Sequence, residues 1–345
     1  MLVLISSVSA DIKNVDCEGD NLKCYKYSFS GNLLRMTYEN NWLHFKGTTD
    51  SPYQELVIKF DYIAKNTYLY NQVSPTLKYS CDAWNWLEVP VIDKQVSFVP
   101  KCENMRIAVF YPVTYDWMNN WVKKWSNSDY ISLAKYKSYQ GRQFNAITIS
   151  NNDGKEKKNV VMVFRQHTNE IYSEYVMFGF IDSFYNNKSF DLLEKYNFLI
   201  FPMANPDGVY TSSGLNAQKL DLNDHWDDND CYEVNLIKSI VKDKFNHVDY
   251  YFDWHGDAGY NVKTESWVYG DKYSDNKEIL SLLNLNTILT KTVLSYPSPE
   301  KSRYYFTKTY GAISVSPEII QTDYSTKELR KNGEYLVEVF RRMAQ

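Results

Sequence analysis

The stretch Val160–Phe180, VVMVFRQHTNEIYSEYVMFGF, decides the fold. Its first five residues are apolar and have the length of a buried strand, and the segment from Ile171 onward predicts an apolar helix. A buried strand that leads directly into a helix is typical of α/β proteins, in which binding sites form just beyond the carboxyl ends of the strands. His167 and Glu170 stand at that position.

The alternation of strand and helix continues to the end of the chain. We expect an α/β fold with a mainly parallel mixed sheet flanked by helices, because helical crossovers join parallel strands. The expected strands are 143–150, 159–164, 196–208 (a strand that ends in a loop), 248–257 and 311–319, and the expected helices are 171–185, 231–245, 277–294 and 326–344.

The first third of the chain has a different pattern. Short alternating or apolar runs over 24–111, separated by turn residues, predict an antiparallel β-sandwich. Residues 114–126 then predict a helix with Trp117, Trp121 and Trp125 on one face. We interpret these tryptophans as a core or domain-interface stripe, with a ligand surface as the alternative. The expected organisation is a signal segment over 1–12, the sandwich domain over 13–125 and the α/β domain over 126–345.

Composition and charge narrow the function classes. The chain has 30 tyrosines and 9 tryptophans, which we interpret as wide aromatic packing, with a sugar-binding sandwich as the alternative. A net charge of −4 lacks the excess of positive charge that is typical of nucleic-acid-binding proteins, so we expect no nucleic acid as a partner. No segment approaches the roughly 18 apolar residues of a membrane span.

The cysteines leave the cellular compartment open. Cys17 with Cys24 and Cys81 with Cys102 can form two disulfides in an exported protein, and four reduced cysteines in a cytosolic protein fit almost as well. Residues 1–12 resemble a short secretory signal, although no positively charged region precedes the apolar run. Together these features favour a secreted or periplasmic protein over a cytoplasmic one.

Three residues at predicted strand ends have the chemistry of metal ligands. His167 and Glu170 can present a nitrogen and a carboxylate to one cation, and His255 after YYFDW can complete a three-ligand zinc site with a fourth position open to water. Asp207 also follows a predicted strand. A His-x-x-Glu pair alone is a weak signal, and each histidine taken singly is more simply an ordinary strand-end residue.

The order of four motifs makes chance a poor explanation. RQHTNE, NPDGV, DLN and DWHG occur in the order and at roughly the spacing of the zinc carboxypeptidase superfamily, which this chain resembles over residues 27–320. It is most similar to the cytosolic-carboxypeptidase-like branch, whose members carry a β-sandwich before the catalytic domain. FSGNLLRM, YPVTYDW and SYQGRQFNAITI resemble that branch's sandwich and its entry into the catalytic domain.

The resemblance implies a role for each matching residue. His167, Glu170 and His255 are implied to bind one Zn²⁺, and Asp221 of DLN to hold the outer nitrogen of His167. Glu318 in GAISVSPEI is implied to be the general base of a hydrolase that cuts peptide (amide) bonds with metal-activated water. The implied partner is a peptide or protein substrate.

Glu318 has one rival for the role of general base. Pro317 directly before Glu318 is not typical of the family. Glu334 is therefore the alternative, although it falls in the expected closing helix, where a solvated face explains a glutamate equally well.

The residues that bind the substrate end depart from the family pattern. Members generally carry an Arg directly after DLN, which binds the free terminal carboxylate of the substrate. They also carry an Arg about seven residues before the Asp of DLN, which stabilises the oxyanion. Here these positions are Asp224 and Gly214. Asn223 remains as a candidate substrate contact, and Lys219 and Arg303 are candidate replacements for the missing charge, with exposed surface charges as the alternative.

The altered region is also acidic. The stretch 221–230 contains Asp227, Asp228 and Asp230, and Asp257 lies two residues after the second histidine ligand. One hypothesis is a pocket that prefers a cationic group, and the alternative is a set of exposed loop charges. Two functions follow: an active zinc hydrolase with unusual recognition of the substrate end, or a catalytically inactive zinc-binding or peptide-binding homologue.

Overall fold

The chain forms two compact units in the computed structural model, and each is described by itself. They divide between Pro112 and Val113. The boundary we expected at residue 125 is therefore too late, because α2 (Tyr115–Trp125) belongs to the second unit. The structure describes residues 11–16, 26–38, 43–65, 67–71, 75–83, 85–151, 153–186, 188–257, 265–272, 275–321 and 324–345.

The first unit contains the two sheets of the predicted sandwich. Tyr79 of one sheet contacts Phe98 of the other with ring centroids 4.7 Å apart, so side chains of the two sheets meet in one core. The pairing is antiparallel except for β3 and β5, which run parallel. The first sheet has the order β1-β4-β9-β6-β7 (Ile12–Asp16, His44–Thr49, Asn104–Ala108, Thr76–Ser80, Leu87–Pro90), the second β2-β3-β5-β8 (Tyr27–Ser30, Leu33–Tyr38, Leu56–Ile63, Gln95–Phe98), and α1 spans Tyr68–Asn71.

One expected disulfide is present in this unit. Cys81 and Cys102 are bonded to each other. The other expected pair, Cys17 with Cys24, and residues 1–10 of the expected signal segment lie outside the described residues.

The second unit is built on one mixed sheet. Its four central strands, β13, β12, β14 and β17, run parallel, and antiparallel pairings join β10, β11 and β15 to them, which confirms the expected fold class. The strand order is β10 (Ile131–Lys137), β11 (Gln143–Ile149), β13 (Tyr196–Phe201), β12 (Lys158–Phe164), β14 (Tyr250–Asp257), β17 (Ile313–Ile320), β15 (Ser266–Asp271) and β16 (Leu289–Ser295).

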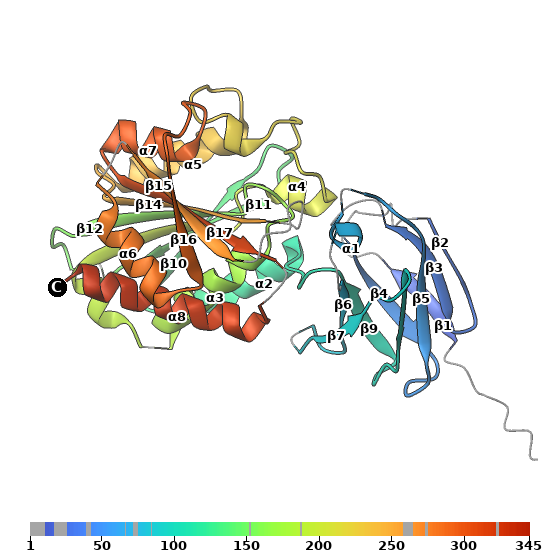
Figure 1. The fold of residues 1–345 in the computed structure, drawn as a ribbon. Helices are drawn as coiled ribbons and strands as arrows, with labels where there is room; N and C mark the ends of the chain where they lie inside the picture. Colours follow the sequence, from blue (N-terminus) through green and yellow to red (C-terminus); the bar gives the residue numbers. More distant parts are fainter. Residues whose placement is uncertain are drawn as a thin grey trace, which may run out of the picture. The chain divides into compact units, whose positions relative to one another are not determined.

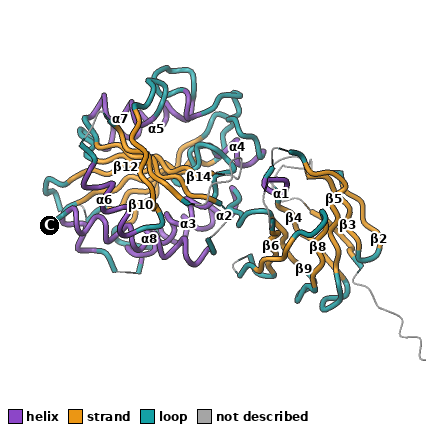
Figure 2. Tube along the Cα trace, in the orientation of Figure 1, coloured by secondary structure: helices purple, strands orange, loops and turns teal. Residues whose placement is uncertain are grey.

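Helices cover both faces of this sheet (Figure 1). Strand side chains alternate between the faces, so Val161 and Val163 of β12 join one core while Phe198 and Phe252 meet the helices on the opposite face. Figure 2 shows the strands of the sheet between these helical layers. The helices are α3 (Tyr172–Tyr185), η1 (Phe190–Glu194), α4 (Pro206–Thr211), η2 (Leu222–Asp224), α5 (Tyr232–Lys244), α6 (Lys277–Asn286), α7 (Ser302–Tyr310) and α8 (Thr326–Met343).

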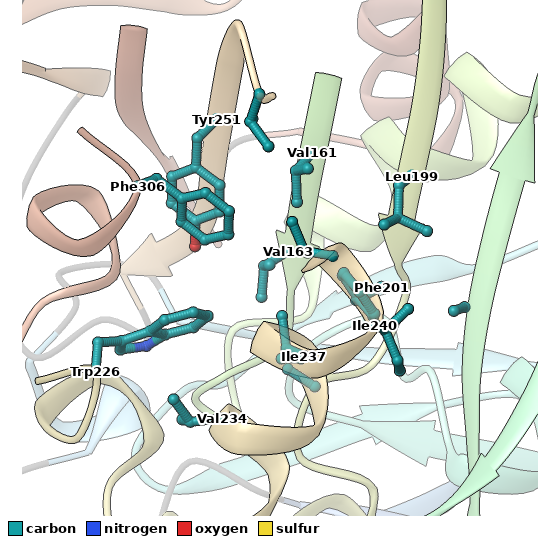
Figure 3. Packing of buried hydrophobic residues seen from close by; sticks show 14 of the residues in the cluster. Val161, Val163, Leu199, Phe201, Trp226, Val234, Ile237, Ile240, Tyr251 and Phe306 are labelled. Carbon is teal, nitrogen blue, oxygen red and sulfur yellow. The ribbon is translucent and has the colours of Figure 1, made fainter. Parts of the chain in front are cut away.

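One core lies between the sheet and helices α5 and α7. Tyr251 of β14 stacks on Phe306 of α7 with ring centroids 3.8 Å apart, and Trp226 packs beside both rings (Figure 3). Ile237 and Ile240 of α5 fill the space over the valines of β12 (Figure 3). This packing fixes α5 and α7 against the strands that carry the candidate site.

Helices α3 and α8 pack together on the opposite face. Their backbones approach at two glycines: a Cβ on Gly179 would collide with the carbonyl of Arg330, and one on Gly333 with the carbonyl of Val176. The tryptophan stripe of α2 also packs on α3, where Trp121 stacks on Phe178 at 4.2 Å. The stripe is therefore core, as expected.

The structure departs from the expected elements in two ways. Residues 277–294 do not form one helix, because α6 ends at Asn286 and β16 follows as an edge strand. Strands β10 and β15 and helix α7 were not among the elements we expected. Among the described residues, no helix is both long and apolar enough to cross a membrane.

Candidate metal centre

Three neighbouring parallel strands define the location of the site. β12 lies between β13 and β14, and β14 lies between β12 and β17. Their carboxyl ends therefore meet at one edge of the sheet, where α/β proteins place their sites. The turn after Phe164, the end of β14 at His255 and the end of β17 at Glu318 all lie at this edge.

Arg165 shapes the turn after β12. Its backbone has a φ of 60°, a left-handed conformation that is uncommon for a residue with a side chain. Its buried guanidinium donates to the carbonyl of Thr168 at 2.6 Å and forms an ion pair with the buried Glu174 of α3. These contacts hold the turn that carries His167 against the first turn of α3.

Gln321, directly after β17, fixes the start of α3. Ile171 at the N-cap makes no side-chain capping bond. The side-chain Oε1 of Gln321 instead accepts from the backbone N–H groups of Ile171 and Tyr172, at 2.6 and 3.2 Å. The Gln321 amide donates to the carbonyl of Asn169 at 2.7 Å. The residue that follows β17 thus fixes the backbone that carries Glu170.

The three expected ligands come together. The two Glu170 oxygens lie 2.8 Å from His167 Nδ1 and 2.8 Å from His255 Nδ1. One donor atom from each residue lies within 4.8 Å of the others. His167 and His255 therefore face a common point beside Glu170 with the same ring nitrogen.

A second carboxylate lies behind each histidine. Asp221 Oδ1 is 3.2 Å from His167 Nε2, the outer-nitrogen position we expected, and Asp253 Oδ1 is 3.1 Å from His255 Nε2. Gln166 donates to Asp253 at 2.6 Å, which orients that carboxylate. Carboxylates at the outer nitrogen fix the tautomer that leaves Nδ1 free for a metal.

The charges of the cluster are strongly coupled. Burial alone would raise the pKa of Glu170, but the positive charges of His167 and His255 outweigh it and lower that pKa to about 2. Burial alone would lower the pKa of His167, and the carboxylates of Glu170 and Asp221 raise it to about 10. Without a metal, these carboxylates favour the protonated form of both rings, and a metal that binds at Nδ1 must displace a proton from each.

This donor set suits zinc. Two imidazole nitrogens and one carboxylate are the ligands of catalytic zinc sites, which keep a further position open. The backbone leaves no spare room: a Cβ on Gly256 would lie 2.8 Å from the carbonyl of Ile319 and 3.6 Å from the Glu170 Cβ. Glycine at position 256 therefore permits the close approach of the β17 backbone beside the site.

Glu318, the expected general base, lies beside the cluster. It is the register partner of His255 in the adjacent strand β17 and its side chain is half-buried. Burial raises its pKa to about 8, although the positive charges of His255 and His167 oppose the rise. The alternative base, Glu334, is exposed on α8.

Asp207 has a different place from the one its sequence position indicated. It accepts from Ser138 at 2.7 Å, from the backbone of Gln140 at 2.9 Å and from Arg142 at 2.9 Å. Asp207 is thus buried against the turn between β10 and β11. Its contacts anchor that turn and do not involve the metal ligands.

The candidate substrate residues lie in different surroundings. Lys219 is exposed in a turn, at a φ of 66°, and Asn223 donates its backbone N–H to Asp221 at 2.9 Å. Asp224 is exposed and forms an ion pair with Lys301. Arg303 is buried at the start of α7, 8% exposed, where it donates to Ser295.

Arg303 is the candidate with an unused donor. Its Nη1 has no hydrogen-bond partner within the part of the chain that the structure describes. Burial lowers its pKa, and the charges of Asp253, Asp271 and Glu318 oppose that shift, so the guanidinium lies within electrostatic reach of the metal site.

The acidic stretch after Asp221 is partly compensated by the chain itself. Asp228 lies 2.8 Å from His225 Nδ1, and Asp227 and Asp230 are exposed. The side chain of Asp257 lies outside the described atoms. These contacts favour the interpretation as loop charges, and a preference for cationic groups stays a hypothesis.

Sequence reasoning missed residues that depend on packing. Asp253 is an exception, because its position beside His255 could have been predicted from the sequence. Residues i and i+2 of a strand face the same side, and Asp253 precedes His255 by two residues. Ser302, which donates to Asp253, and Lys301, which pairs with Asp224, had no local signal.

Fold and site define the class: an α/β protein with a His-Glu-His metal centre at the carboxyl edge of a mixed sheet. Residues 114–296 match the model of the zinc carboxypeptidase family, so the chain belongs to this family. The match ends before Arg303 and Glu318.

The curated relatives match about half of the chain. It is 29% identical over 191 residues to mouse (Mus musculus) cytosolic carboxypeptidase 6, covering 50% of this chain and 34% of the relative. It is 30% identical over 193 residues to mouse cytosolic carboxypeptidase 2, covering 50% and 22%. The chain thus spans about a third or less of these relatives.

Solved structures share the fold across nearly the whole chain. A metallo-carboxypeptidase from Burkholderia cenocepacia superposes with a TM-score of 0.79 at 16% identity, covering 97% of this chain and 99% of that one. A metallo-carboxypeptidase from Pseudomonas aeruginosa, in complex with (2-guanidinoethylmercapto)succinic acid, gives 0.77 at 18% identity, with 96% and 99% covered. Both units therefore have counterparts in known carboxypeptidase structures.

Proposed function

We propose that this protein is a zinc-dependent hydrolase of the metallocarboxypeptidase type that cleaves a peptide (amide) bond with metal-activated water. The observation that carries the proposal is the register of β14 and β17, in which Glu318 stands opposite the metal-facing His255. A metal-binding cluster and a carboxylate beside it are the two parts that this reaction needs. The substrate is a peptide or protein.

In this proposal His167, Glu170 and His255 hold one zinc ion through two Nδ1 atoms and a carboxylate oxygen. When bound, zinc supplies a Lewis acid that activates a water molecule and polarises the scissile carbonyl. Asp221 and Asp253 keep the two rings oriented from behind.

Glu318 has the role of proton carrier. Its carboxylate accepts a proton from the attacking water and delivers it to the nitrogen of the leaving amine. The half-buried position keeps the group accessible to a substrate at the strand edge.

Arg303 supports non-standard recognition of the substrate. The family arginine after DLN is replaced by Asp224, which cannot bind a carboxylate bidentately. Arg303 offers a buried guanidinium with a free Nη1 near Asp253 and Glu318. An anionic group of the substrate can pair with it there.

The test measures zinc and turnover on the same samples. The purified protein is assayed for bound zinc and for hydrolysis of a peptide library, next to the Glu318→Gln variant. We expect about one zinc ion per chain in both proteins and turnover only in the wild type. Bound zinc without turnover in either protein overturns the hydrolase.

A catalytically inactive zinc-binding or peptide-binding homologue is the alternative. The observation that favours it is the absence of arginine at Asp224 and Gly214, because loss of one oxyanion donor costs about 10²–10³ in rate. Peptide binding that depends on zinc, without cleavage, is the outcome that this alternative predicts.

The compartment belongs to the same proposal. A disulfide between Cys81 and Cys102 persists in an oxidising environment, which supports export from the cytoplasm. Mass spectrometry of the protein isolated from its native cells tests this: reduced cysteines at both positions would contradict export.

A further inference from the structure

The segment that leads into α7 is bound to the loop that follows Asp221. The carbonyl of Glu300 accepts from the backbone N–H of Trp226 at 2.9 Å. The next residue, Lys301, forms an ion pair with Asp224. Two consecutive residues therefore join segments that lie far apart in the sequence, at the position where the family arginine is missing.

The pair lies close to the metal cluster. Asp224 ends the short helix η2, whose N-cap is Asp221, and Asp221 lies 3.2 Å from His167 Nε2. Burial alone would raise the pKa of Asp221, but contacts with His167, the backbone of Asn223 and the charge of Lys301 lower it. The Lys301 ammonium is thus within electrostatic reach of the carboxylate that holds a candidate zinc ligand.

The ammonium remains reachable from solvent. The Lys301 side chain is 33% exposed and that of Asp224 49%. Because the pair is partly exposed, the ammonium can contact a second partner from solvent while it stays beside Asp224. A lysine ammonium has three N–H donors, so it can bind Asp224 and a second carboxylate at once.

Resting on the proposed function, we propose that Lys301, positioned by Asp224, binds the free terminal carboxylate of the peptide substrate. The cation is carried by the segment before α7, and the aspartate that replaced the family arginine holds it in place. The lysine acts as a point charge and not as a bidentate fork. Arg303, two residues further along the chain, is buried, whereas Lys301 is partly exposed.

The experiment compares two matched peptide libraries on the zinc-loaded full-length protein. Both contain blocked dipeptides of the form acetyl-Ala-X, one with a free carboxyl end and the other amidated. Hydrolysis rates and calorimetric binding constants are measured for each. We expect the wild type to prefer the free carboxyl end.

Lys301→Met is expected to lower that preference about 10- to 100-fold, the loss of one charged hydrogen bond. The effect falls on KM and binding, while kcat changes little. Lys301→Arg keeps most of the preference. Lys308→Met, a change of lysine at the other end of α7, is the control and leaves the preference intact.

The positioning role of Asp224 has its own readout. Asp224→Asn is expected to lower the preference for free carboxyl ends. Asp224→Glu, which keeps the negative charge, is expected to retain it. Combining Lys301→Met with Asp224→Arg, which returns the family arginine, restores the preference as well. A merely structural role for the pair would not give these rescues.

The outcomes separate this inference from the proposed function. Binding that prefers free carboxyl ends and is lost in Lys301→Met, without turnover, supports Lys301 and overturns the hydrolase. Turnover with equal preference for free and amidated ends overturns Lys301 and leaves the hydrolase. A preference that survives Lys301→Met but is lost in Arg303→Gln, in a variant that unfolds at the wild-type temperature, also overturns Lys301.

Discussion

His255 on β14 and Glu318 on β17 are direct partners in the register of two neighbouring parallel strands. Partners in such a ladder point to the same side of the sheet. The register therefore sets the position of the proposed general base relative to one metal ligand through backbone hydrogen bonds alone. Residues on strands are held in place more precisely than residues on loops, so the distance between the proposed base and the metal ligand varies little.

The first prediction concerns Glu318. Glu318→Gln removes the carboxylate that accepts a proton but keeps the size of the side chain. We expect kcat to fall about 10²- to 10⁴-fold with bound zinc unchanged. Glu334→Gln, a change on the exposed face of α8, is the control and keeps full activity. Activity that survives Glu318→Gln but not Glu334→Gln would assign the base to the helix.

The second prediction concerns the carboxylate behind His255. Asp253→Asn removes the negative charge 3.1 Å from His255 Nε2. Loss of such a partner typically weakens metal binding 10- to 100-fold, so we expect a shift of about that size in a zinc competition assay with a chelator. Asp227→Asn, a change of an exposed residue, should leave zinc affinity unaltered. Equal affinities for all three proteins would show that Asp253 does not act on the metal.

Much of the site could be predicted because its chemistry is local in the sequence. His167 and Glu170 lie in the one turn that follows the central strand β12. This short separation in the sequence is enough to bring their side chains together. His255 was a candidate from its place at a predicted strand end, whereas Asp221 depended on the resemblance to a family. Lys301 depends on how the segment before α7 lies against the loop after Asp221, which no local pattern specifies.

The fold shows the same limit at the edges of its sheet. Central strands such as β12 have a continuous apolar run, here Val160 to Phe164, because both faces are covered, and this run could be recognised in the sequence. β16 is an edge strand with mixed burial, so its leucines continued the helical spacing of α6. The β-branched residues Thr290, Thr292 and Val293 were the signal for a strand.

The third prediction tests the crossing of α3 and α8. Gly179→Ala places a Cβ against the backbone carbonyl of Arg330, which no rotamer change can relieve. We expect the free energy of unfolding to fall by about 1–3 kcal/mol or more, measured by denaturant titration. Gly214→Ala adds a methyl group with no atom within 4 Å and serves as control. A stability equal to that of the control would mean that the helices lie further apart.

The fourth prediction is a pH dependence that arises from the Cys231 thiol. Burial raises the pKa of this thiol from 9.0 to about 11. Below pH 9 the thiol is protonated in both the folded and unfolded states, so its contribution to stability is complete there. Between pH 9 and 11 the unfolded chain releases the proton while the folded protein keeps it, and the contribution is lost as the pH rises.

The difference in free energy of unfolding between the wild type and Cys231→Ala should therefore shrink by about 1–2 kcal/mol over this range, measured by urea titration at each pH. Alkylation at pH 8, followed by peptide mapping, should leave Cys231 unmodified in the folded protein and modify it in urea. A constant difference across the pH range, together with rapid alkylation of the folded protein, would place the thiol at the surface.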